Sequence, residues 1–100
     1  MPCFLIESTF KRPFESFGDA VAEHRAHLKK GYDEGWLLVS GPKLDKSGGI
    51  MVARVDSVAT IEAFFDADPY RHRGLAEYRV TGFDAVLSDP LIAGWLATSS

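Results

Sequence analysis

The fold depends first on residues 35–55, GWLLVSGPKLDKSGGIMVARV, which contain two apolar runs separated by a mostly polar segment. The first run, Trp36–Ser40, is almost continuously apolar, as expected of a strand covered on both sides, and Gly41-Pro42 should end it. A polar turn follows over residues 44–49, and β-branched residues resume over 50–55. The stretch therefore predicts a β-hairpin with a loop longer than the tightest turns.

A helix precedes this hairpin, and a first strand precedes the helix. Residues 3–9 are apolar and favour a strand until Lys11-Arg12-Pro13 interrupts them. Over residues 16–34, apolar or small residues recur at helical spacing, which predicts a helix with one buried face. Ser16 and Asp19 approximate a capping box at its start. The predicted face consists of Phe17, Ala20, Val21, His24, Leu28, Gly31 and Tyr32.

A second helix and a last strand follow the hairpin. Ser57 can cap a helix over residues 58–66, and Asp68-Pro69 interrupts it because the residue before a proline is pushed out of helical geometry. Residues 78–87 alternate as a strand does. The resulting order, β-α-β-β-α-β, predicts an α+β, ferredoxin-like fold: an antiparallel sheet with both helices on one face.

The other face of such a sheet must be covered, and we expect a second copy of the chain to cover it. A chain of 100 residues with 46% apolar side chains makes a single small domain, and small domains often finish burying apolar surface in a two-fold homodimer. The domain is expected over residues 1–88, with a short C-terminal tail over 89–100. Residues 91–96, with Trp95, could supply part of the dimer contact.

Composition narrows the classes of function. The 11 basic and 14 acidic residues give a net charge of −3, which disfavours binding to nucleic acid. No apolar run approaches the ~20 residues of a membrane helix, and residues 1–4 do not resemble a targeting segment, so we expect a cytoplasmic protein with no membrane partner. One cysteine, Cys3, gives no support to a redox or zinc site. No motif indicates a cofactor.

His24 is the most informative candidate for chemistry, because a titratable ring lies near the middle of an apolar helix face. One interpretation is a buried neutral ring that is hydrogen-bonded to a backbone carbonyl. The other is a general base or acid whose tautomer is fixed by a carboxylate, for which Asp68 is the natural partner. Asp68 could instead only cap a turn before Pro69.

The remaining polar residues give weaker signals. His27 lies at the edge of the same helix face, and His24 and His27 lack a persuasive third ligand, so we expect no metal site. The cluster Arg71-His72-Arg73 could attract an anionic substrate, although solvated surface is the simpler interpretation. Gly41-Pro42 could line a pocket with backbone groups.

Three short motifs occur in an informative order. They are His24-Arg25-Ala26-His27-Leu28, then Gly35-x-Leu37-Leu38-x-Ser40-Gly41-Pro42, and finally Asp68-Pro69-Tyr70 followed by Gly74-Leu75. Together, over about Phe4–Leu87, they resemble the YCII-related (YciI-like) family. The resemblance implies a ferredoxin-like fold that dimerises by packing sheets into an α+β barrel, and a cavity in which a His-Asp pair, here His24 and Asp68, is catalytic.

Two functions remain open at this point. Some relatives remove chloride from a chlorinated hydroxyquinol without a cofactor, which implies an enzyme that moves a proton in an elimination or isomerisation of a small aromatic or enol-like substrate. The alternative is a non-catalytic dimer module that binds a small molecule or serves as an accessory protein. In either case, the expected contacts to the small molecule are Trp36, Ser40, Gly41, Pro42 and Tyr70.

Overall fold

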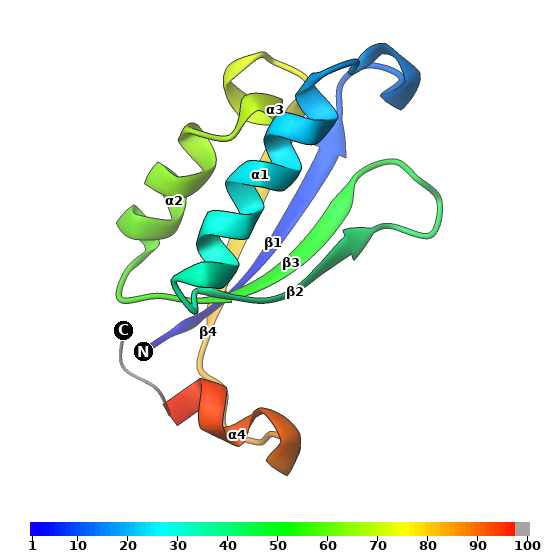
Figure 1. Ribbon diagram of the computed structural model, residues 1–100. Helices are drawn as coiled ribbons and strands as arrows, with labels where there is room; N and C mark the ends of the chain where they lie inside the picture. The colour runs from blue at the N-terminus through cyan, green and yellow to red at the C-terminus, as the bar shows by residue number, and fades with distance from the viewer. Residues whose placement is uncertain (98–100) are drawn as a thin grey trace.

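The computed structural model describes residues 1–97 and contains a four-stranded antiparallel sheet (Figure 1). The strand order is β2-β3-β1-β4, in which β1 and β3 are central, and every neighbouring pair is antiparallel. This order confirms the predicted β-α-β-β-α-β, ferredoxin-like plan. The strands are β1 (Cys3–Phe10), β2 (Leu37–Pro42), β3 (Gly49–Arg54) and β4 (Ala76–Phe83).

The helices α1, α2 and α3 cover one face of the sheet, whereas α4 lies beyond the end of β4 (Figure 1). None of the helices within residues 1–97 is both long and apolar enough to cross a lipid bilayer. The helical elements are η1 (Phe14–Ser16), α1 (Ala20–Asp33), α2 (Val58–Asp66), α3 (Pro69–His72) and α4 (Pro90–Ala97).

The first helix begins later than the predicted span of 16–34. The hydroxyl of Ser16 donates to the carbonyl of Pro13 at 2.6 Å within the separate turn η1, so it does not cap α1. Asp19 precedes α1, but its carboxylate accepts from Arg73 at 3.0 Å and makes no capping hydrogen bond. The predicted capping box is therefore wrong, because a residue distant in sequence binds its acidic member.

Two strand ends also differ from the predictions. Gly41 and Pro42 are the last residues of β2, where Pro42 pairs with Gly49. A proline is tolerated there because β2 is an edge strand and its missing N–H removes no hydrogen bond from the sheet. The last strand, predicted over 78–87, starts two residues earlier and ends at Phe83.

The core lies between the sheet and the helices on its covered face. Ile6, Ala53, Ile61 and Phe65 are completely buried there. A second, smaller cluster lies under the N-terminal end of α1 and places Tyr70 beside the site described below. Its other buried members are Phe17, Ala20 and Ala76.

The opposite face of the sheet carries exposed apolar side chains. Leu5, Val39, Ile50 and Phe83 are 40%, 55%, 41% and 44% exposed. The strand that contains Val39 is predicted to be covered on both faces. In the single chain, however, β2 is an edge strand and the Val39 side chain is exposed. The structure of the single chain therefore leaves an apolar sheet face available.

One end of this face is closed by the C-terminal segment. Trp95 of α4 lies over the Arg54 guanidinium at 5.2 Å, and its indole N–H donates to the carbonyl of Gly35 at 3.0 Å. Arg54 is 1% exposed beneath it. Much of the predicted tail is thus a helix, α4, whose Trp95 contacts the sheet and the turn before β2, while its final residues 98–100 lie outside the described residues.

Candidate functional site

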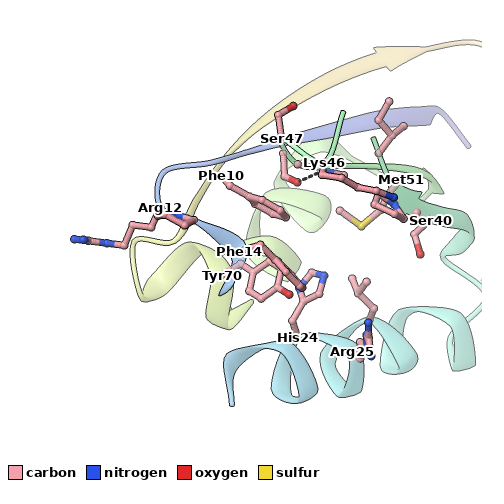
Figure 2. Close-up of a pocket in the computed structure, with 18 of the residues that line it drawn as sticks. Phe10, Arg12, Phe14, His24, Arg25, Ser40, Lys46, Ser47, Met51 and Tyr70 are labelled. Atoms are coloured by element: carbon pink, nitrogen blue, oxygen red, sulfur yellow. Dashed lines mark hydrogen bonds between the residues drawn. The ribbon is translucent and has the colours of Figure 1, made fainter. Parts of the chain in front are cut away.

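A cavity of about 880 Å³ lies between α1, the end of β1 and the β2–β3 hairpin (Figure 2). Several lining residues are solvent-exposed, so the cavity is open to solvent. Its walls combine aromatic and aliphatic side chains, which include Phe10, Phe14, Leu28, Met51 and Tyr70. Of the residues predicted from the sequence to contact a small molecule or act on it, the lining contains His24, Ser40, Gly41, Pro42 and Tyr70.

The His24 ring projects from α1 into this cavity (Figure 2). Its Nδ1 lies 2.8 Å from both carboxylate oxygens of Asp68. The Asp68 side chain is completely buried, whereas the side chain of His24 is 13% exposed. The structure thus brings together two residues that are separated by 44 positions in the sequence.

Asp68 is fixed by the start of α3. Pro69 occupies the first helical position, so Asp68 is the N-cap and its Oδ1 accepts from the backbone N–H of Tyr70 at 3.0 Å. Asp68 therefore has the capping role that was the alternative interpretation of this residue. The same carboxylate also binds His24, so one side chain both caps α3 and holds the imidazole.

Tyr78 is a third member of the site that the sequence predictions did not include. Tyr78 lies on the covered face of β4. Its hydroxyl donates to Oδ2 of Asp68 at a distance of 2.9 Å. Burial first, and then the negative charge of Asp68, raise the pKa of the Tyr78 hydroxyl far above its ordinary value of 10.0. Tyr78 therefore stays protonated at neutral pH and remains a hydrogen-bond donor to the carboxylate.

Tyr70 packs directly on the imidazole. The two rings are stacked, with centroids 3.8 Å apart and planes at 5°. Burial first, and the charge of Asp68 second, raise the pKa of the Tyr70 hydroxyl, while Arg25 opposes these effects. The stacked ring limits the orientations of the imidazole, so His24 is held by Asp68 at one edge and by Tyr70 on one face.

These contacts assign the tautomer of the His24 ring. Since a carboxylate can only accept, Nδ1 carries the proton that His24 donates to Asp68, and Nε2 of the neutral ring bears a lone pair. Nε2 has no hydrogen-bond partner within residues 1–97. The ring nitrogen that is left for a molecule in the cavity can therefore accept a proton.

His27 has the structural role that was one alternative for His24. Its Nε2 lies 2.6 Å from the carbonyl oxygen of Phe64, and the two rings stack with centroids 4.3 Å apart. Trp36, which was expected to contact the small molecule, packs edge-to-face against Phe64 instead and is not part of the cavity lining. The Trp36 ring contributes to the core next to α2, and its contact with a small molecule stays a prediction.

The basic cluster Arg71-His72-Arg73 does not lie at this cavity. Its two arginines are engaged in ion pairs that connect α3 to α2 and to the start of α1, so their charges are balanced by carboxylates. The partners are Glu62 and Asp66 for Arg71, and Asp19 and Glu23 for Arg73. No group of three or more His, Cys, Asp or Glu side chains in residues 1–97 is arranged to hold a metal ion.

The chain is similar to one protein family in sequence and to solved structures in fold. The family model of the YCII-related domain matches residues 4–84. A solved structure of 5-chloro-2-hydroxyhydroquinone dehydrochlorinase (TftG) from Burkholderia phenoliruptrix AC1100, in complex with 2,5-dihydroxybenzoquinone, is similar with a TM-score of 0.69 and 26% identity, and the match covers 82% of this chain and 93% of that chain. An antibiotic biosynthesis monooxygenase shares the fold, with a TM-score of 0.57 and 14% identity over 85% of this chain and 99% of that chain. No curated protein matches the sequence significantly.

Tyr78→Phe should reduce the loss of stability at alkaline pH. A hydroxyl whose pKa is raised on folding binds its proton more tightly in the folded state, so its stabilising effect is complete below pH 10.0 and is lost as the pH rises above that value. At neutral pH the variant should lose about 1–3 kcal/mol, because one hydrogen bond to a charged group is removed. Urea unfolding at a series of pH values measures both effects.

Tyr32→Phe is the matched control, because the Tyr32 hydroxyl lies on the surface and, within residues 1–97, bonds only to Ser40. It should retain the alkaline decline of the unaltered protein. An equal decline above pH 10.0 in Tyr78→Phe and the unaltered protein would contradict the buried hydrogen bond to Asp68.

Proposed function

The chain belongs to the YCII-related family, and on this basis we propose that it is a small enzyme in which His24 transfers a proton with the support of Asp68. The reaction is an elimination such as dehydrochlorination, or an isomerisation, of a small aromatic or enol-like substrate, and it uses no cofactor. The observation that carries this proposal is the divided role of the imidazole. Nδ1 is held by a buried carboxylate, while Nε2 is left to the cavity.

The chemistry follows from this arrangement. Nε2 of His24 takes a proton from the substrate, and the imidazolium that forms is stabilised by the Asp68 carboxylate at Nδ1. In an elimination, the released electron pair forms a new double bond and chloride leaves with the electrons of the C–Cl bond. The net loss is HCl. In an isomerisation, the same nitrogen returns the proton to a different atom.

Three further observations support this function over a purely structural histidine. The related structure with 26% identity is described as a dehydrochlorinase, whose reaction removes HCl. His27 on the same helix makes the backbone hydrogen bond expected of a structural histidine, and His24 does not. Phe10 and Phe14 line the cavity and are not fully buried, so they offer apolar ring surface on which an aromatic or enolic substrate can lie.

The proposed assembly is a homodimer that pairs the open faces of two sheets, as in the α+β barrel that the family resemblance implies. Leu5 and its exposed neighbours lie on the face of the central and edge strands that the helices leave open. Their burial against a second copy would remove an exposed apolar surface from water.

His24→Gln should lower kcat/KM for release of chloride from 5-chloro-2-hydroxyhydroquinone by roughly two to four orders of magnitude, the contribution expected of a general base. His27→Gln is the matched control and should retain the rate, because its ring is engaged with the carbonyl of Phe64. Circular dichroism verifies that both variants are folded.

Turnover by His24→Gln at the rate of the unaltered protein would contradict the proposal. Binding of the chlorinated hydroquinone without release of chloride, with an affinity that changes modestly in His24→Gln, would instead favour the non-catalytic binding module. The two functions are separated by the same pair of variants, measured once for rate and once for affinity.

Leu5→Glu should convert a dimer into a monomer without unfolding it. Leu5 is 40% exposed in the single chain, so the charge is tolerated there but would be buried between two paired sheets. Sedimentation analysis should give twice the chain mass of 11.0 kDa for the unaltered protein and for the control Leu44→Glu, at a residue that is 98% exposed. An unaltered protein that sediments as a monomer, or a dimer that persists in Leu5→Glu, would overturn this assembly.

A further inference from the structure

The basic residues of the chain are distributed unevenly between ion pairs and the cavity. Five of the 11 are bound to carboxylates, and Arg54 is buried under Trp95. Within residues 1–97, the side chains of the remaining five have no acidic partner; Arg12, Arg25 and Lys46 line the cavity, whereas Lys30 and Arg79 do not. Cations thus collect at one opening of a protein whose net charge is −3.

Two of these cations belong to opposite walls of the cavity that His24 lines. Arg25 follows His24 on α1, and Lys46 lies on the hairpin across the cavity (Figure 2). The guanidinium of Arg12 extends away from the cavity in the same view, so its charge is farther from the imidazole. Glu15 is the single acidic residue among those that line the cavity, and it leaves the rim with a net positive charge.

The positions of both residues are set by the backbone. Lys46 has the left-handed φ of 65°, and its N–H donates to the carbonyl of Lys43 at 2.9 Å, which fixes the turn of the hairpin. Arg25 lies on the regular helix α1. Its positive charge lowers the pKa of the Tyr70 hydroxyl, although burial and Asp68, which raise this pKa, have larger effects. The field of Arg25 therefore reaches the ring that stacks on His24.

We propose that Arg25 and Lys46 bind a carboxylate group of the substrate, so that the cavity selects aromatic or enolic acids over neutral compounds of the same shape. This inference rests on the proposed function, since it names the substrate class of the same site. A phenolic hydroxyl, with an ordinary pKa of about 10, is neutral at pH 7 and would leave both cations without a counter-charge, whereas a carboxylate satisfies them. The apolar walls hold the ring, and the two cations orient it beside Nε2 of His24.

The test compares benzoate with benzamide, which have the same shape and differ in charge. Binding is followed by NMR chemical-shift titration at low ionic strength. The unaltered protein should bind benzoate more tightly than benzamide, and this preference should weaken as salt is added. Arg25→Gln and Lys46→Gln should each lower the affinity for benzoate about two- to fivefold, as expected for partly exposed charge pairs. The affinity for benzamide should not change.

Lys30→Gln is the matched control, because Lys30 is an exposed cation on the same helix that does not line the cavity. It should leave the affinity for benzoate unchanged. Equal affinities for benzoate and benzamide, no measurable binding of either compound, or an equal effect of Lys30→Gln would each overturn the proposed carboxylate site.

Failure of this inference is distinguishable from failure of the proposed function. If benzoate shows no preference while His24→Gln still abolishes chloride release, the carboxylate site is wrong and the proton transfer stands. If the two cation variants weaken benzoate as expected while His24→Gln retains full turnover, the carboxylate site stands and the proposed role of His24 is wrong.

Discussion

The hydrogen bonds to the buried carboxylate of Asp68 are the constraint on which the site depends. A carboxylate that is completely buried must be matched by donors, because an unpaired buried charge is costly. Here the donors come from α1, α3 and β4, in the form of His24, the N–H of Tyr70 and the hydroxyl of Tyr78. The carboxylate thereby connects two helices to the sheet at the point where the cavity opens.

This arrangement explains how the residues around Asp68 fix the orientation of the His24 ring. The proline after Asp68 starts α3, the start of α3 orients the carboxylate, and the carboxylate selects the tautomer of the imidazole. Tyr70 contributes both a backbone donor to Asp68 and a ring that stacks on His24. The same short motif that ends the second long helix therefore supplies the positioning groups for the proposed base.

The parts of the fold that local chemistry governs could be predicted from the sequence. The second helix has the predicted span 58–66, and its cap Ser57 accepts from the N–H of Thr60, because propensity and capping act within a few residues. The start of α1 could not be predicted, since Asp19 binds Arg73 across 54 positions. Tyr78 could have been suspected from its inward place in the last strand, but only the packing of β4 against α3 brings its hydroxyl to Asp68.

The central claim is that His24 is held as the Nδ1–H tautomer with Nε2 free to accept a proton. Long-range ¹H–¹⁵N NMR of the imidazole rings tests it most directly, with His24→Gln used to assign the signals. The neutral ring of His24 should carry a proton on Nδ1 and none on Nε2. A neutral His24 ring that carries its proton on Nε2 would contradict this tautomer and the proposed role of Nε2 as the proton acceptor.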